Sequence, residues 1–276
     1  MQFGQYRIER RLGGEGALYL ARDTERNLEV VLRVLGRGFS DPERMQRIVQ
    51  RTKAALALKH RNVATIYEIG EASGAWFVAT EYVQGEPLHA RTDGYPLSAA
   101  DIGGMAIQVA DALIHAHGRG IVHGDITPSN IMVTPGGQVK LLNFGLGREL
   151  ADDMFDWPDW VDGVRLQFVR YISPEQLYPR EEDSRSDLFS LGIVLYEAAT
   201  GRPPQDPRAE LLQFITARVD FKQPEAVTRV NAKVPAELGH IIHRCLEKDL
   251  ERRYQSACDL AVDLKNIMRP GAYSEL

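Results

Sequence analysis

The chain has 276 residues, of which 44% are hydrophobic and 26% are charged, and its formal net charge is −5. This composition is that of an ordinary globular protein, and it excludes a disordered or fibrous chain. The negative charge disfavours a protein whose main partner is a nucleic-acid backbone.

Apolar–polar alternation predicts three strands in the first 35 residues, and two more strands follow a single helix. The helix is expected to begin at Pro42 after a cap at Asp41, because proline favours the first helical position. The five expected strands span residues 6–12, 18–22, 29–35, 63–69 and 75–83.

From residue 98 onward the spacing of apolar residues is that of helices. Ser98 followed by Asp101 resembles a capping box, which predicts a helix start. Two short strands, 131–133 and 139–142, are expected within this helical part. Further helices are expected at 186–200, 207–218, 236–246 and 256–267.

The sequence also predicts where the protein resides. Two cysteines, Cys245 and Cys258, cannot form a disulfide framework, so a reducing, cytoplasmic environment is expected. Residues 1–11 contain charges and no apolar run, which is unlike a signal peptide. The longest apolar stretch, residues 188–200, is too short to cross a bilayer.

Six short motifs follow one another along the chain. They are LGGEG at 12–16, VVLR at 30–33, HGDITPSN at 123–130, NFG at 143–145, SPE at 173–175 and DLFSLG at 187–192. In this order and spacing they resemble the bacterial branch of the eukaryotic-like Ser/Thr protein kinases, over nearly the whole chain.

The resemblance implies an α+β, bilobal protein-kinase-like fold, with a β-rich N-lobe that carries the family's αC helix and a mainly helical C-lobe. The expected plan is one kinase-like domain over residues 1–276, with the N-lobe at 1–83, the C-lobe at 84–268 and the start of a linker at 269–276. Domains of this branch are often followed by a membrane helix, so the cytosolic part of a longer membrane-anchored protein is the alternative to a purely cytoplasmic chain.

The resemblance implies that two polar residues of the family's phosphoryl-transfer site are retained in this sequence. Asp125 stands at the position of the catalytic base, and Asn130 stands at the position of a second metal ligand. Loop residues of this kind also hydrogen-bond to the backbone and would be useful in an inert fold. Both are therefore interpreted as vestigial.

Five other motif positions depart from the family pattern. Arg33 replaces the lysine that holds the α- and β-phosphates, and counting back from the next loop places the partner glutamate at Arg51. Two cations about 4 Å apart would repel by roughly 4 kcal/mol at an effective dielectric near 20. Gly124, Thr127 and Asn143 replace the arginine of the HRD motif, the catalytic-loop lysine and the Mg²⁺-carrying aspartate of the DFG motif.

The nucleotide cleft is expected to be occluded. Gly13 and Tyr19 are six steps apart, against eight in the family, so the glycine loop is two residues short. Val31 replaces an alanine that stacks on adenine, and overpacking of this kind costs about 1–3 kcal/mol. No cofactor and no metal site are therefore expected, with ATP bound without Mg²⁺ as the alternative. The residues assigned to the cleft are Gly13, Gly14, Gly16, Leu18, Val31, Thr80 and Met132.

Five residues match positions that hold the family's fold together. Glu175 and Arg253 match a buried ion pair between the activation segment and the last helices. Asp187 matches an aspartate that accepts hydrogen bonds from the catalytic-loop backbone. His123 and Phe144 match residues of the packed spine.

The segment between Asn143 and Tyr171 contains no serine or threonine, so it cannot be phosphorylated on those residue types. It is acidic and aromatic, and two interpretations stay open. One is a solvated loop; the other is a recognition element for a basic groove on a partner or on the chain's own αC helix. The candidate partner-binding residues are Phe155, Trp157, Trp160, Asp153 and Asp156.

These departures predict a pseudokinase, that is, a kinase-like domain that is not an enzyme and that binds or regulates another protein. The expected partner is an active kinase or a protein with a basic surface, and neither nucleic acid nor membrane is expected to bind this segment. The alternative is an atypical Ser/Thr protein kinase with weak activity or metal-independent ATP binding.

Overall fold

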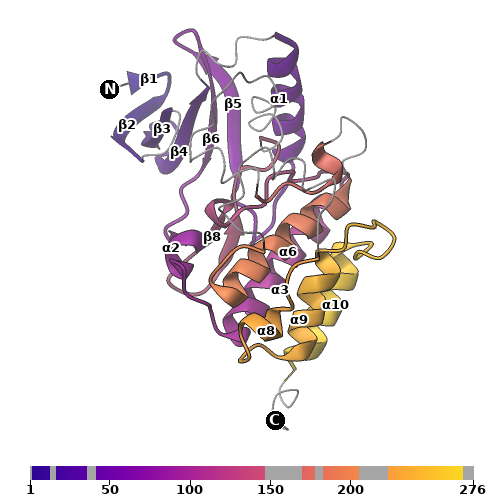
Figure 1. Cartoon of the computed structure of the whole chain (residues 1–276). Coiled ribbons are helices and arrows are strands. Elements are labelled where there is room, and N and C mark those ends of the chain that lie inside the picture. Colours follow the sequence, from indigo (N-terminus) through magenta and orange to yellow (C-terminus); the bar gives the residue numbers. More distant parts are fainter. Residues whose placement is uncertain are drawn as a thin grey trace, which may run out of the picture.

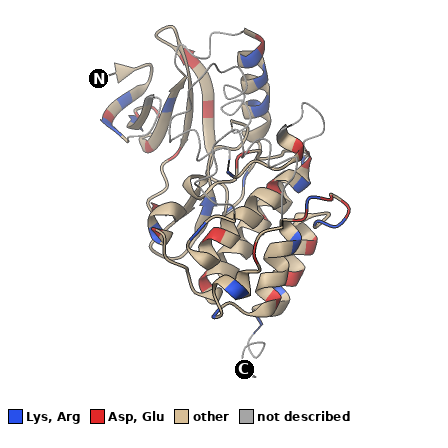
Figure 2. Ribbon diagram, in the orientation of Figure 1, with Lys and Arg blue, Asp and Glu red and all other residues tan. Residues whose placement is uncertain are grey.

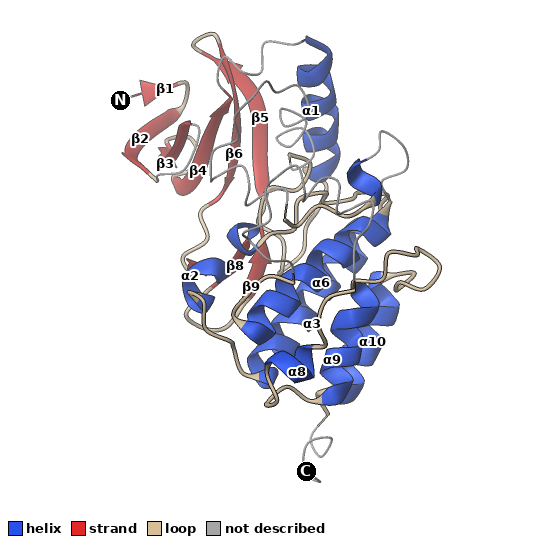
Figure 3. Ribbon diagram, viewed as in Figure 1, coloured by secondary structure: helices blue, strands red, loops and turns tan. Residues whose placement is uncertain are grey.

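The computed structural model describes residues 2–12, 17–35, 42–146, 170–177, 183–204 and 223–269. A strand-rich lobe with one long helix contains the N-terminus, and a mainly helical lobe contains the C-terminus (Figures 1 and 3). The predicted α+β arrangement of two lobes is confirmed.

The first lobe is built on a six-stranded sheet in the order β1-β2-β3-β4-β6-β5, in which all neighbouring strands are antiparallel. One face of β4 buries Val30 and Leu32 in a small apolar core with Phe77. Because alternate residues of a strand point to opposite faces, Val31 and Arg33 lie on the other face. The strands are β1 (Gln2–Phe3), β2 (Tyr6–Arg11), β3 (Ala17–Asp23), β4 (Leu28–Leu35), β5 (Ile66–Ala72) and β6 (Ala75–Glu81).

The strand expected at residues 63–69 begins later, at Ile66. Val63 forms an isolated parallel bridge with Leu141, and the Ala64 N–H donates to the Leu141 carbonyl at 2.8 Å. The segment before β5 therefore pairs with the second lobe, and its β-like residues belong to a connection between the lobes.

Helix α1 (Pro42–Ala55) lies beside β5 (Figure 1). Its inward face buries Met45, Ile48, Thr52 and Ala55, at the spacing of one helical face. The proposed cap at Asp41 lies outside the described residues.

A second, three-stranded sheet lies at the start of the helical lobe. It has the order β7-β8-β9 and follows directly from the connection after β6. Its elements are β7 (Glu86–Pro87), β8 (Ile131–Val133) and β9 (Val139–Leu141), and helix α2 (Leu88–Thr92) follows β7.

The helical lobe is organised around α6 (Ser184–Thr200), which is buried over nearly its whole circumference. Helix α6 packs against α3 and α9, and α10 packs against α3. The surrounding helices are α3 (Ala99–His117), α8 (Val227–Val230), α9 (Ala236–Cys245) and α10 (Ala257–Ile267). The helix expected at 207–218 lies outside the described residues. Over the ranges given above, no helix combines the length and apolar character that a bilayer span requires.

Helix α3 begins as its sequence predicts. The Ser98 hydroxyl accepts a hydrogen bond from the Asp101 N–H at 3.1 Å and donates to the Asp101 carboxylate at 2.7 Å.

We expect Ser98→Ala to lower the free energy of unfolding by about 1 kcal/mol, because one N–H of the first turn loses its acceptor. Ser98→Asn restores an acceptor and should stay close to the wild type in urea denaturation; equal losses in the two variants would contradict the capping role.

Candidate active site

One carboxylate of helix α6 fixes the loop that carries Asp125. Asp187 accepts hydrogen bonds from the backbone N–H of His123 at 2.9 Å and of Gly124 at 2.8 Å. Burial alone would raise the pKa of Asp187, but His117 and the backbone N–H of His123 outweigh it and hold the pKa below its usual value. The loop is therefore bound to a buried anion.

His117, at the end of α3, is a functional residue that the sequence reasoning missed. Its Nε2 lies 2.8 Å from the Asp187 carboxylate, and it is a third hydrogen-bond partner of this group. None of the sequence motifs assigns His117 a role. Its place in the last turn of a helix, six residues before His123, was the only available signal.

The His123 ring connects the loop to the NFG motif. Its Nδ1 accepts from the Asp125 N–H at 3.2 Å, and its Nε2 donates to the Leu142 carbonyl at 2.7 Å. Burial lowers the pKa of His123, which favours this neutral form. The ring also packs edge-on against Phe144, with the ring centroids 4.5 Å apart. The structure thus brings His123 and Phe144 together beside Asp125.

Three polar side chains form one hydrogen-bonded chain in the site. The Asn130 amide donates to the Asp125 carboxylate at 2.7 Å and to the Asp125 carbonyl at 2.8 Å. The Asn143 amide donates to the Asn130 side-chain oxygen at 2.7 Å. Asn143 has a φ of 64°, a left-handed conformation that asparagine tolerates better than most residues.

The carboxyl of Asp125 differs from an exposed aspartate. Burial raises its pKa to about 7, although the hydrogen bond from Asn130 and the charge of Arg33 oppose this shift. At neutral pH the group is therefore divided between its acid and its base form.

Arg33 is the cation that faces this carboxyl. It lies half-buried on β4, and its pKa is lowered by burial and raised by the charge of Asp125. A guanidinium stays protonated in proteins, so Arg33 is a permanent positive charge in the cleft.

Arg51 was expected to face Arg33, but its side chain lies on the exposed side of α1. Basic residues recur along α1 (Figure 2), but Arg51 is exposed, while Thr52 occupies the buried face of the helix. The charge acting on Arg33 is that of Asp125. Counting from the loop did not give the direction of the Arg51 side chain.

The other substituted positions are small or neutral. Gly124 has a φ of 75°, a conformation in which a residue with a side chain would be strained. Thr127 is buried, and its hydroxyl has no hydrogen-bond partner among the residues that the structure describes. Neither residue supplies the positive charge that the family pattern has at its position.

Strands β3, β4, β6 and β8 position the described residues assigned to the nucleotide cleft. Val31 is paired with Thr80 on β6, Leu18 is paired with Arg33, and Met132 is on β8. The Leu12 N–H donates to the Leu18 carbonyl at 2.9 Å, which continues the pairing of β2 with β3. Gly13, Gly14 and Gly16 lie outside the described residues, so the occlusion of the cleft remains a prediction.

Gly145 links the NFG motif to α1. Its φ is 77°, and a Cβ at this position would lie 2.8 Å from the Arg51 carbonyl oxygen. Only glycine fits there without displacing the helix backbone. The NFG motif is therefore in direct contact with α1 at Gly145.

Glu175 and Arg253 form a buried ion pair with N–O distances of 2.6 and 3.2 Å. The Arg253 side chain is 0% exposed and that of Glu175 is 12% exposed. Burial alone would raise the pKa of Glu175, but the hydrogen bond and charge of Arg253 hold it below its usual range. The Ser186 hydroxyl also donates to Glu175 at 2.8 Å, which ties this pair to the start of α6.

The candidate partner-binding residues cannot be placed in the site. Phe155, Trp157, Trp160, Asp153 and Asp156 all lie outside the described residues, so their role stays a prediction. Just beyond that segment, the Tyr171 hydroxyl donates to Glu197 of α6.

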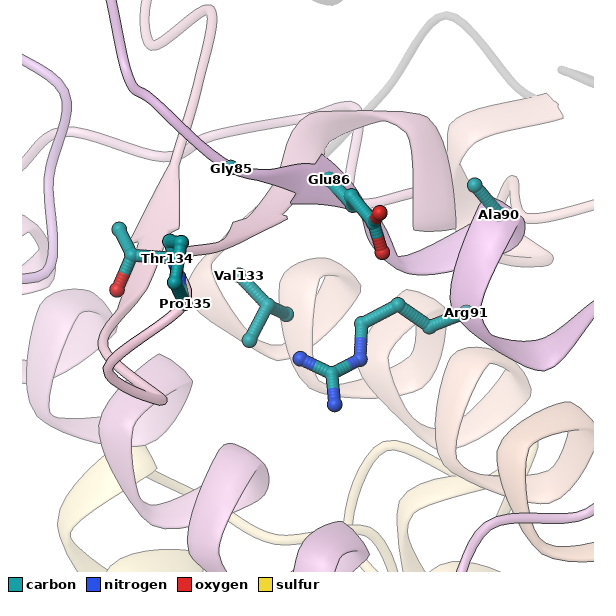
Figure 4. Close-up of a pocket in the computed structure, with 7 residues that line it drawn as sticks. All are labelled: Gly85, Glu86, Ala90, Arg91, Val133, Thr134 and Pro135. Atoms are coloured by element: carbon teal, nitrogen blue, oxygen red, sulfur yellow. The ribbon is translucent and has the colours of Figure 1, made fainter.

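A pocket of about 550 Å³ lies where β7, α2 and the end of β8 meet (Figure 4). The side chains of Glu86 and Arg91 extend into it. It is on the opposite side of β8 from the Met132 side chain, because Val133 lines it and alternate residues of a strand face opposite ways. Its lining is Gly85, Glu86, Ala90, Arg91, Val133, Thr134 and Pro135.

The fold and the site define a member of the protein kinase domain family, since residues 6–263 match that family. Serine/threonine-protein kinase PrkC of Bacillus subtilis is 33% identical over 95% of this chain and 40% of its own length. Serine/threonine-protein kinase PknB of Mycolicibacterium smegmatis is 33% identical over 92% of this chain and 41% of its own length. Serine/threonine-protein kinase Pkn1 of Myxococcus xanthus is 35% identical over 92% of this chain and 37% of its own length. The chain thus spans about two fifths of these curated relatives.

The prediction that the chain is not an enzyme is wrong. Relatives named as Ser/Thr protein kinases are 30–35% identical to it over more than nine tenths of its length, and they point to an enzyme. The sequence reasoning gave each altered position separate weight. It gave too little weight to the retained Asp125 and Asn130 and to the scaffold that positions them.

The ion pair predicts a large contrast between two neighbouring arginines. Arg253→Gln should lower the free energy of unfolding by about 3–5 kcal/mol, because it leaves a buried carboxylate without its partner. Arg252 is 76% exposed and 3.6 Å from Asp249, so Arg252→Gln should cost at most about 0.5 kcal/mol. Similar losses in chemical denaturation would show that the buried pair does not support the lobe.

The same pair predicts a pH dependence. The folded state lowers the pKa of Glu175 below its usual value of 4.5, so its contribution to stability is complete above that pH and is lost as the pH falls through the folded-state pKa. The difference in free energy of unfolding between the wild type and Glu175→Gln should therefore shrink below pH 4.5. A difference that stays constant or grows on acidification would contradict the lowered pKa.

Proposed function

We propose that this chain is an atypical Ser/Thr protein kinase with weak phosphoryl-transfer activity. The observation that carries the proposal is the placement of Asp125, which Asn130 holds through two hydrogen bonds and which lies in a loop held by Asp187. The names of the relatives support the same reaction class.

In this reaction a Ser or Thr hydroxyl oxygen forms a bond to the γ-phosphorus of ATP, the bond to the β-phosphate oxygen breaks and ADP leaves. Asp125 accepts the hydroxyl proton, and the hydrogen bond that its carboxylate accepts from the Asn130 amide keeps the carboxylate in place.

The altered positions make the activity weak. Thr127 adds no positive charge near the transferred phosphoryl group, and a neutral amide at Asn143 replaces an anion. Such positioned charges provide much of the rate enhancement in phosphoryl transfer, so their loss lowers the rate.

Phosphorylation of serine or threonine between Asn143 and Tyr171 has no place in its regulation. Residues between Asn143 and Tyr171 include neither serine nor threonine, and Gly124 stands where a phosphate-binding arginine would be. We propose that the kinase is active without modification of that segment.

A radiolabelled-phosphate assay on the purified chain tests the proposal. Slow transfer to the chain itself or to a basic protein substrate is expected, and Asp125→Ala should reduce its rate by about 100-fold or more. The absence of transfer, or transfer that persists unchanged in Asp125→Ala, would refute the proposal.

A further inference from the structure

The family implies that Mg²⁺ accompanies ATP, and the polar chain of the site tests whether the residues present fit that ion. The two positions concerned are Asn130 and Asn143. Their hydrogen bonds, described above, decide which atoms face the place where a metal ion would bind.

The orientation of both amides is fixed by Asp125. Both partners of the Asn130 NH₂ group are oxygens of Asp125, so the Asn130 oxygen must point the other way. That oxygen lies 2.7 Å from the Asn143 amide, which must then present its NH₂ group, because two amide oxygens would repel at this distance. The order of donors and acceptors is thus set from one end of the chain to the other.

These residues do not fit Mg²⁺. Mg²⁺ binds oxygens at about 2.0–2.1 Å in octahedral geometry, so two neighbouring ligand atoms lie about 2.9 Å apart. The Asn130 oxygen and the Asn143 nitrogen have nearly this spacing, but an N–H lies between them. The two atoms are therefore joined by a hydrogen bond and not arranged as two metal ligands. Asn143 also contributes no anionic ligand.

The side chain of Arg33, and not a metal ion, provides a positive charge for the phosphates. Arg33 lies on the face of β4 that also carries Val31, it is half-buried, and the charge that acts on it is that of Asp125. A guanidinium matches phosphate oxygens with paired N–H donors. It can therefore neutralise part of the negative charge of a triphosphate without a metal ion.

We propose that the cleft binds the triphosphate of ATP without a divalent metal ion, with Arg33 as its counter-charge. This inference rests on the proposed function only in that the same cleft takes ATP. It concerns binding, so it can be tested separately from phosphoryl transfer.

Calorimetric titration of the 276-residue chain with ATP, in EDTA and in millimolar Mg²⁺, tests the proposal. The dissociation constant in EDTA should be equal to that in Mg²⁺ within about twofold, or smaller. Arg33→Gln should weaken binding in EDTA about tenfold or more, while Arg33→Lys keeps the charge and should retain most of the affinity. Arg7→Gln, which removes an exposed arginine of β2, is the matched control and should bind as the wild type does.

A substitution at residue 143 should make ATP binding depend on Mg²⁺. Asn143→Asp replaces the N–H with an oxygen at the spacing of two Mg²⁺ ligands, and ATP binding should then become about tenfold tighter in Mg²⁺ than in EDTA. Asn143→Ala removes the amide without adding a carboxylate and should show no metal dependence. Aspartate tolerates the left-handed conformation of residue 143, so the backbone can be kept.

Several results would overturn the inference. They are wild-type binding about tenfold tighter in Mg²⁺ than in EDTA, no binding in either buffer, and unchanged affinity of a folded Arg33→Gln variant. Should Arg33→Gln not fold, the comparison of Asn143→Asp with Asn143→Ala decides: equal behaviour of the two in Mg²⁺ overturns it. Metal-independent binding together with no phosphoryl transfer would support this inference and refute the proposed function.

Discussion

The buried carboxylate of Asp187 is the interaction on which the site depends. It binds two backbone N–H groups of the loop before Asp125, and His117 keeps it ionised in the interior. Removing the Asp187 carboxylate from this buried network would leave several polar groups without a hydrogen-bond partner. The loop can therefore stay in position while side chains that face the cleft change.

The difference between a fixed loop and variable cleft side chains explains how a sequence with so many altered motif positions belongs to the protein kinase family. The changes at Thr127 and Asn143 concern charge in the cleft, whereas Asp187, His123 and the Glu175–Arg253 pair hold the second lobe together. Electrostatic demands on the cleft and packing demands on the scaffold are separate constraints. A chain can keep the packing of the scaffold in full and still carry different charges in the cleft.

The sequence predicted both lobes, most of the described elements and the capping of α3 by Ser98, because these follow from local periodicity and spacing. It could not predict the direction of Arg51, since one position of rotation about α1 decides whether Arg51 or Thr52 is buried. It missed His117 because a hydrogen bond to a residue seventy positions away has no local signal. The chain Asp125–Asn130–Asn143 also needed three dimensions, because each residue looked like an isolated loss or retention.

The contact between Gly145 and the Arg51 carbonyl has a mechanical consequence. There is no side chain between the two backbones, so nothing compressible separates them. A sliding movement of α1 would push directly on the turn that carries Asn143, and from there on the amide of Asn130. The position of α1 and the position of the turn that carries Asn143 are thus linked by direct backbone contact.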